Sequence, residues 1–276
     1  MKYRILASCA ALLGLAVATM GSALAQDTEA DRRAKDPRNK NYIVGEKKSG
    51  YVFMTALTRD MQDDDFANPA FTVVDVGQEQ WNKVNGKAGK SCASCHNDIA
   101  SMKGVANKYP QYDSSQDRMI SLQHLINRHL EKDMGAKPWK WESTQMLGMV
   151  ALIKSQSRGM PVNVRLDGPA KKFFEKGREF YNQRRGQMDM SCAHCHDNNY
   201  GNMARSNVLS QGQMNGFPTY RFKWQGVGSL HRRFIGCNKN IRATPYKRGS
   251  EEYTNLELYM QWRSSGLKWE SPSVRN

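Results

Sequence analysis

The spacing of apolar residues predicts a chain built mainly from short helices. Between Gln116 and Met134, the apolar side chains Met119, Leu122 and Ile126 recur at intervals of three and four residues, which is the spacing of one helix face. Gly135 and Pro138 are expected to end this helix. Further helices are expected at Trp141–Ser155 and Asn255–Trp262. The fold class is therefore predicted to be mostly α.

Two parts of the chain repeat one plan at an offset of 100 residues. Each copy starts with a predicted helix that carries a glycine and an aromatic residue, Gly77 with Trp81 and Gly177 with Tyr181. The repeat also pairs Gly86 with Gly186, Ser91 with Ser191, and Ala93 with Ala193. Such a repeat indicates two copies of one structural unit.

Each copy contains the pentapeptide Cys-x-x-Cys-His, at Cys92–His96 and at Cys192–His196. This motif attaches c-type haem: both sulfurs add to vinyl groups and the histidine binds the iron. Zinc or thioredoxin-like CxxC motifs are the alternative, but the histidine after each second cysteine and the matched upstream helix favour haem. We therefore predict two covalently bound haem c groups in two cytochrome c-like domains related by internal duplication. The predicted attachment residues are Cys92, Cys95, Cys192 and Cys195, and the predicted axial ligands from the motifs are His96 and His196.

The first 25 residues have the organisation of a secretory signal peptide. A basic start, Lys2 and Arg4, precedes the apolar stretch Ile5–Ala18 and a small-residue cleavage site at Ala23-x-Ala25. The apolar stretch is too short to span a membrane. The expected product is exported, with no membrane association.

Two domains are expected after the signal peptide. Residues 26–160 are expected to form the first haem domain with an N-terminal extension, and residues 161–276 the second haem domain. The segment Arg158–Pro161 is the expected linker. The polar residues 26–50 are expected to form a mobile arm or a segment that wraps a partner.

The charge of the chain points to an anionic ligand. The net charge is +15, and the stretch from Asn198 to Ser250 contains nine Lys or Arg and no Asp or Glu. Haem propionates need some basic neighbours, but nine exceed what one haem requires. Nucleic acid is not expected as a partner of an exported haem protein, so a small anion or an acidic protein surface is favoured.

A six-coordinate haem needs a second axial ligand, commonly Met, His or Cys. In the first unit, His129 follows Ile126 by three residues and continues its apolar face, whereas His124 shares a face with Arg128 and Glu131. The pattern favours His129 as the ligand. A role for His129 as a core histidine, with Met119, Met134 or His124 on the iron, remains the alternative.

In the second unit, Cys237 is favoured as the second ligand. Leu230, Phe234 and Cys237 share a face if the segment is helical, although Gly236 weakens that helix. The competing candidates are Met203, Met214, His194 and His231. His194 lies inside the haem motif and cannot easily reach the opposite side of the iron.

Cys237 also stands apart from the other cysteines. Cys9 lies in the signal peptide and four cysteines bind haem, so Cys237 has no disulfide partner in the chain. Arg233 lies one helical turn earlier; a guanidinium favours the thiolate and can hold an anionic oxygen group. An inert buried thiol is the alternative, but the basic surroundings favour a functional cysteine.

Four segments that span most of the chain from about Gly50 onward resemble SoxA, the c-type cytochrome subunit of the periplasmic SoxAX complex of bacterial thiosulfate oxidation. They are Met61–Pro69, Lys90–His96, Ser155–Pro161 and Arg233–Arg242. The resemblance implies that Cys237 is the distal ligand of the second haem and the catalytic cysteine, sometimes carrying an extra sulfur as a persulfide. It also implies that Arg233 binds the substrate.

The resemblance further implies the activity of an L-cysteine S-thiosulfotransferase. Such an enzyme conjugates thiosulfate to a cysteine of the carrier protein SoxYZ, and two electrons leave through haem to an electron-accepting cytochrome c. The implied partner is the SoxX cytochrome subunit, in a heterodimer, and the implied location is the periplasm. A thiosulfate dehydrogenase that forms tetrathionate and a non-catalytic electron-relay cytochrome are the alternatives. The chain departs from its relatives at His129, where dihaem members commonly carry a cysteine ligand.

Overall fold

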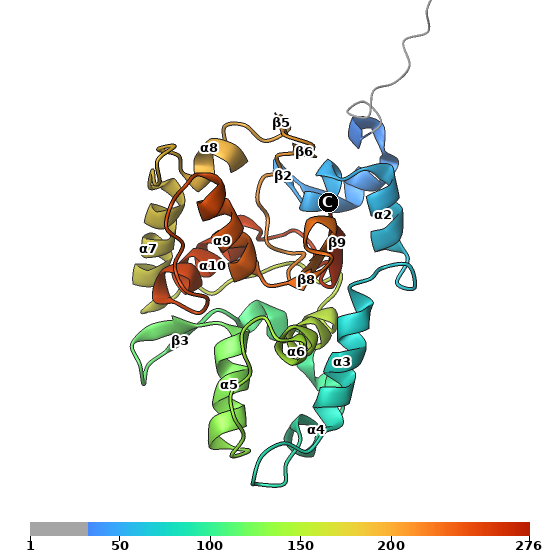
Figure 1. The fold of residues 1–276 in the computed structure, drawn as a ribbon, viewed down its shortest axis with the longest axis vertical. Coiled ribbons are helices and arrows are strands. Elements are labelled where there is room, and N and C mark those ends of the chain that lie inside the picture. Colours follow the sequence, from blue (N-terminus) through green and yellow to red (C-terminus); the bar gives the residue numbers. More distant parts are fainter. Residues whose placement is uncertain (1–32) are drawn as a thin grey trace, which may run out of the picture.

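The computed structural model describes residues 33–276, so the predicted signal peptide lies outside the described residues. Two helical units lie one above the other along the long axis of the molecule, with α3 to α6 below and α7 to α10 above (Figure 1). The helices are α2 (Ala56–Asp63), α3 (Phe71–Asn82), α4 (Cys92–His96), α5 (Leu122–Lys132), α6 (Thr144–Ser155), α7 (Ala170–Asn182), α8 (Cys192–His196), α9 (Leu230–Asn240) and α10 (Glu251–Arg263). Among the described residues, no helix is long and apolar enough to cross a membrane.

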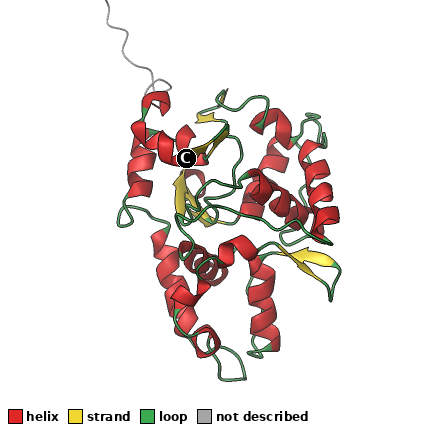
Figure 2. Ribbon diagram, turned by 180° about the vertical axis from the view of Figure 1, so that it is seen from behind, coloured by secondary structure: helices red, strands yellow, loops and turns green. Residues whose placement is uncertain are grey.

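Strands form only a small part of the fold, as Figure 2 shows. Three antiparallel pairs stand alone, β1 with β2, β3 with β4, and β5 with β6. One three-stranded sheet has the order β8-β7-β9, in which β9 runs parallel to β7. The bounds are β1 (Ile43–Val44), β2 (Lys47–Lys48), β3 (Gln111–Asp113), β4 (Arg118–Ile120), β5 (Met203–Ala204), β6 (Asn207–Val208), β7 (Thr219–Arg221), β8 (Gly226–Gly228) and β9 (Ser273–Arg275). The predicted fold class, mostly α, is confirmed.

In both units the first helix crosses the last helix at a glycine. A Cβ added to Gly77 of α3 would lie 2.3 Å from the carbonyl oxygen of Gly148 in α6. A Cβ added to Gly177 of α7 would lie 2.1 Å from the carbonyl oxygen of Asn255 in α10. Only glycine permits backbones to approach this closely. The repeated glycines of the sequence therefore mark one helix crossing that occurs twice.

The duplication extends beyond the repeat visible in the sequence. The β3–β4 hairpin and the β7–β8 hairpin pair in the same register, Gln111 with Ile120 and Thr219 with Gly228, at an offset of 108 residues. Ser121 and Ser229, which are also 108 residues apart, are the N-caps of α5 and α9. The offset grows from 100 to 108 within the loop that contains β5 and β6 in the second unit. This insertion explains why a single-offset comparison detects only the haem-motif half.

The helix predicted over Gln116–Met134 is wrong at its start, because α5 begins at Leu122. Asp117 turns the preceding hairpin with a positive φ of 44°. Met119 lies on β4 and is buried in the apolar core of the second unit, not on α5. The apolar intervals fit a strand followed by a capped helix as well as one continuous helix. Ser121, whose hydroxyl takes part in a capping box, is the local signal that sets the true start.

The described part of the N-terminal extension is not a mobile arm, because it packs against the second unit (Figure 1). The Lys48 backbone N–H donates to Gln211 Oε1 at 2.7 Å. Ser49 hydrogen-bonds to the buried carboxylate of Glu270, which also accepts from Gln62 at 2.9 Å. The described part of the N-terminal extension therefore packs against the second unit, although the first unit lies between the two in the sequence.

The two units meet across a compact set of aromatic and polar contacts. Trp141 stacks on His231 of α9 with ring centroids 4.9 Å apart, and His124 of α5 lies edge-on to Trp141 at 5.0 Å. His124 Nε2 lies 3.0 Å from the carbonyl oxygen of Gly249. The buried Lys154 donates from Nζ to the carbonyl oxygen of Phe217 at 3.2 Å. These contacts hold α5 of the first unit and α9 of the second unit each against the opposite unit.

Candidate functional site

The two Cys-x-x-Cys-His motifs form the short helices α4 and α8. In each, the preceding serine caps the helix: the Ser94 backbone N–H donates to Ser91 Oγ at 3.1 Å, and Ser191 Oγ lies 2.7 Å from His194 Nδ1. Capping fixes the direction of these one-turn helices and hence of the motif side chains. His194 is held in the cap, as expected for a residue that cannot reach the opposite side of the iron.

In the first unit, the structure places the ring of His129 beside that of His96, in an edge-to-face arrangement. Their ring centroids are 6.0 Å apart and the rings are inclined at 75°. A bond from a transition metal to an imidazole nitrogen is about 2 Å long, so one iron fits between the two rings. The residues present therefore fit a haem with His96 on one side and His129 on the other.

The competing residues of the first unit are occupied elsewhere. His124 uses both ring nitrogens, since the Ser121 N–H donates to Nδ1 at 3.1 Å and Nε2 contacts the Gly249 carbonyl. Burial, followed by the charge of Arg118, lowers the pKa of His124 to about 4. Met119 belongs to the core of the second unit. Met134 is buried within the first unit's own apolar core.

In the second unit, the structure brings His196 and Cys237 into hydrogen-bond contact. His196 Nδ1 lies 2.7 Å from the carbonyl oxygen of Ser210, which fixes the ring tautomer and leaves Nε2 for a metal. Gly212, with a φ of +69°, packs against the ring: an added Cβ would lie 2.9 Å from His196 Cγ. An imidazole and a thiolate sulfur are both ligand types that a haem iron takes.

Cys237 is half-buried on α9, one turn after Arg233. Burial raises its pKa, but the charge of Arg233, the hydrogen bond with His196 and the charge of Arg221 outweigh burial and lower the pKa to about 6. The sulfur is therefore a thiolate at neutral pH, and a thiolate is both a nucleophile and a metal ligand. Helix α9 continues through Gly236, so the predicted helical face is confirmed.

Arg221 is the residue of this site that the sequence did not single out. It lies on β7, and its guanidinium donates to the backbone oxygen of Asn276 at 2.7 and 2.9 Å and lies over the ring of Trp224 at 5.2 Å. Burial and the neighbouring Arg233 lower its pKa to about 10. Arg221 falls within the acid-free basic stretch, but only the β7–β8 hairpin brings it near α9.

His129 and Cys237 occupy equivalent positions in the two units. Each lies eight residues after the N-cap serine of its helix, Ser121 for α5 and Ser229 for α9. The duplicated fold thus presents one side chain from the same helical position toward the histidine of each haem motif. The two units differ in the chemistry of that side chain, imidazole in the first and thiol in the second.

The other candidate ligands of the second unit are engaged in other contacts, buried in the apolar core or exposed. His231 is buried, contacts Glu257 through Nε2 at 3.1 Å and accepts the Gly249 N–H at Nδ1. Met214 is buried in the apolar core and Met203 is 61% exposed. Cys237 is therefore the candidate that the structure places beside His196.

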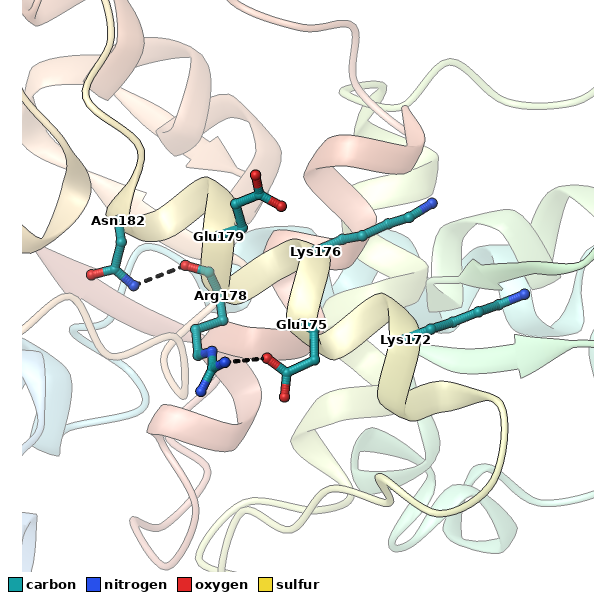
Figure 3. A pocket seen from close by; sticks show the side chains of 6 residues that line it. All are labelled: Lys172, Glu175, Lys176, Arg178, Glu179 and Asn182. Carbon is teal, nitrogen blue, oxygen red and sulfur yellow. Dashed lines mark hydrogen bonds and ion pairs between the residues drawn. The ribbon is translucent and has the colours of Figure 1, made fainter.

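Figure 3 shows a hollow on the outer face of α7, lined by Lys172, Glu175, Lys176, Arg178, Glu179 and Asn182. Its charged groups form ion pairs, such as Arg178 with Glu175 at 2.6 Å and Lys176 with Glu251 at 2.8 Å. Within residues 33–276, no group of three or more His, Cys, Asp or Glu is arranged to hold a metal ion.

Comparison with known proteins identifies relatives over most of the chain. The family described as SoxA/TsdA, cytochrome c domain, matches residues 76–162 and 176–269. The L-cysteine S-thiosulfotransferase subunit SoxA of Paracoccus pantotrophus is 45% identical over 83% of this chain and 79% of its own length. The subunit of the same name from Pseudaminobacter salicylatoxidans is 44% identical over 88% of this chain and 85% of its own. The crystal structure of SoxXA from P. pantotrophus superposes with a TM-score of 0.81, over 83% of this chain and 87% of that chain.

Proposed function

We infer that this chain, which belongs to the SoxA family of c-type cytochromes, is an L-cysteine S-thiosulfotransferase subunit that carries haem c. It conjugates thiosulfate oxidatively to a cysteine of a carrier protein, SoxYZ. The observation that carries the proposal is the placement of the Cys237 sulfur beside His196 and Arg233. An electron-relay cytochrome needs an axial ligand at this position, but electron transfer alone does not require a thiolate stabilised by two arginines.

Each unit binds one haem c, giving two haems per chain. Cys92 and Cys95 would hold the first haem together with His96 and His129, and Cys192 and Cys195 would hold the second together with His196 and Cys237. The support is the duplicated geometry, in which α5 and α9 carry His129 and Cys237 at the same position after the N-cap serine. The intact mass of the purified chain should show two added haem groups, and one group would contradict the proposal.

Arg233 binds the substrate, and the charge of Arg221 adds to the attraction of this site for an anion. Thiosulfate is a dianion with a sulfonate-like end, and a guanidinium donates two parallel hydrogen bonds to such oxygens. The two guanidinium groups come from α9 and β7, and both lower the pKa of Cys237. An anion held by Arg233 presents its terminal sulfur to Cys237.

Cys237 carries the group that is transferred. A bond forms between Cys237 Sγ and the terminal sulfur of thiosulfate, which oxidises the sulfurs by two electrons. Haem c, when bound, would take up these two electrons one at a time and pass them to the electron-accepting cytochrome c. A carrier cysteine thiolate then attacks the terminal sulfur, the bond to Cys237 breaks, and Cys237 leaves as a thiolate. The low pKa of Cys237 makes it a good leaving group in this exchange.

The chain works as part of an exported complex. We expect a heterodimer with a SoxX cytochrome subunit, in line with the SoxXA complex of P. pantotrophus, and an electron-accepting cytochrome c as a further partner. The periplasm is the expected location, since residues 1–25 have the pattern of a secretory signal. No nucleic acid or membrane partner is expected.

Replacing Cys237 with Met tests the catalytic role. Methionine retains a sulfur ligand for iron but cannot form the S–S bond, so Cys237→Met should abolish carrier conjugation with both haems in place. Lys239→Ala is the matched control, because it removes an exposed cation from the same helix. Near-normal conjugation by a fully haem-loaded Cys237→Met protein would leave the electron-relay function standing. Tetrathionate formation without the carrier would indicate a thiosulfate dehydrogenase.

A further inference from the structure

Asp133 contacts the proposed distal ligand of the first haem. It is the C-cap residue of α5, and its carboxylate Oδ2 lies 2.5 Å from His129 Nδ1. The two residues are four positions apart, and the Asp133 backbone N–H also donates to the His129 carbonyl at 3.0 Å. The backbone bond fixes Asp133 at the end of the helical turn that carries His129, and the carboxylate takes up Nδ1 of the imidazole.

The second unit has no counterpart of this carboxylate. The C-cap residue of α9, twelve residues after its N-cap serine as Asp133 is on α5, is Ile241. Where the second unit fixes an imidazole, at His196, the partner of Nδ1 is the neutral carbonyl of Ser210. The carboxylate is therefore a specific feature of the unit in which the distal ligand is a histidine.

We propose that Asp133 is a positioning residue for the first haem: its carboxylate keeps His129 in the tautomer whose Nε2 binds iron and increases the electron donation of that imidazole. The inference rests on His129 being the distal ligand, as proposed above. A carboxylate that accepts the second N–H of a ligating histidine fixes ring and tautomer and raises ligand basicity. A more basic ligand stabilises the ferric over the ferrous haem, so Asp133 lowers the reduction potential.

The size of the effect follows from the exposure of the pair. Removing an outer partner of a metal ligand commonly changes affinity by about 10- to 100-fold. The side chains of His129 and Asp133 are 44% and 54% exposed, and solvent and salt screen exposed charges. We therefore expect the lower limit, about tenfold in the ferric-to-ferrous preference, which is about 59 mV for a one-electron couple.

The test is a redox titration of the haem-loaded protein, followed by electron paramagnetic resonance so that the two differently ligated haems are resolved. Asp133→Asn should raise the potential of the first haem by about 59 mV and leave the second unchanged. Asp133→Glu, which restores a carboxylate, should recover part of the shift. Glu131→Gln removes a neighbouring exposed carboxylate without a contact to His129 and should not change the potential.

Two results would overturn the inference. One is an unchanged potential of the first haem in Asp133→Asn. An equal shift in Glu131→Gln would count in the same way, because it would show that any nearby negative charge has the effect and that the contact with His129 does not matter. The other is an unchanged low-spin spectrum in His129→Ala, which would remove the ligand itself. Neither result bears on thiosulfate conjugation, which is measured separately through Cys237, so failure here and failure of the proposed function are distinguishable.

Discussion

At the scale of single residues, the chemistry of the second unit depends on what surrounds one sulfur. Cys237 is the one described cysteine outside a haem motif, and cations from two elements and an oriented histidine act on it. Arg233 precedes it on α9, Arg221 approaches from β7, and His196 hydrogen-bonds to it. A buried thiol without these neighbours would have a raised pKa and would be inert.

The contribution of Arg233 can be measured through substrate affinity. In the proposed role, Arg233→Ala removes a charge-assisted hydrogen bond to thiosulfate worth roughly 1.5–3 kcal/mol, so the KM for thiosulfate should rise about 10- to 100-fold with the haem content unchanged. Arg233→Lys should recover only part of the loss, because a point charge does not reproduce the bidentate geometry. Arg232→Ala, in which the neighbouring arginine that stacks on Trp224 is removed, is the control. An unchanged KM in Arg233→Ala would contradict a role in substrate binding.

At the scale of secondary structure elements, both units are built on a crossing of two helices through a glycine. The crossings of α3 with α6 and of α7 with α10 bring backbone atoms into contact at Gly77 and Gly177. The second crossing also carries Tyr181, whose hydroxyl donates to Asp197 Oδ1 at 2.9 Å directly after the haem motif. Each crossing therefore supports the motif helix that follows it.

Adding a single methyl group to the second crossing should be costly. In Gly177→Ala, the new Cβ would lie 2.1 Å from the Asn255 carbonyl oxygen, so α7 and α10 must separate. Overpacking of this kind lowers the free energy of unfolding by about 1–3 kcal/mol. Lys171→Ala, on the exposed face of the same helix, should change it by less than about 0.5 kcal/mol. Thermal unfolding of both variants measures the difference, and equal midpoints would show that the crossing is not tight.

At the scale of the whole molecule, the two units are joined by side chains of one unit that pack on or hydrogen-bond to the other. His124 from the first unit reaches the Gly249 carbonyl of the second, and Trp141 stacks on His231. The N-terminal extension packs on the second unit through the hydrogen bond between Ser49 and Glu270. The beginning of the described chain therefore contacts its C-terminal half. Stability of the interface therefore depends on the protonation of His124.

Acid should weaken this interface. The folded protein holds His124 neutral, with a pKa of about 4, whereas an unfolded histidine has a pKa of about 6.5. The unfolded chain thus binds the proton more readily, and the stabilisation is fully present above about pH 6.5 and is lost as the pH falls toward 4. His124→Asn, which can still accept the Ser121 N–H, should show a flatter dependence of Tm on pH between 7 and 4. Parallel curves for the two proteins would rule out His124 as the responsible group.

The sequence by itself determined the parts of this protein that depend on neighbours along the chain. The haem motifs, the helices around the repeated glycines, and the pairing of Arg233 with Cys237 all follow from short spacings, since residues four apart on a helix share a face.

Only the tertiary structure decided what depends on distant segments. Hydrophobic spacing shows that a face is buried but not against which partner, so Met119 was assigned to the wrong element. The polar N-terminal extension was expected to be a mobile arm or to wrap a partner, whereas its described part packs on the second unit. The approach of Arg221 to Cys237 requires the β7–β8 hairpin, and the equivalence of His129 with Cys237 emerges from a second offset that an insertion conceals. Contacts of this range arise when the chain closes on itself, and no local pattern encodes them.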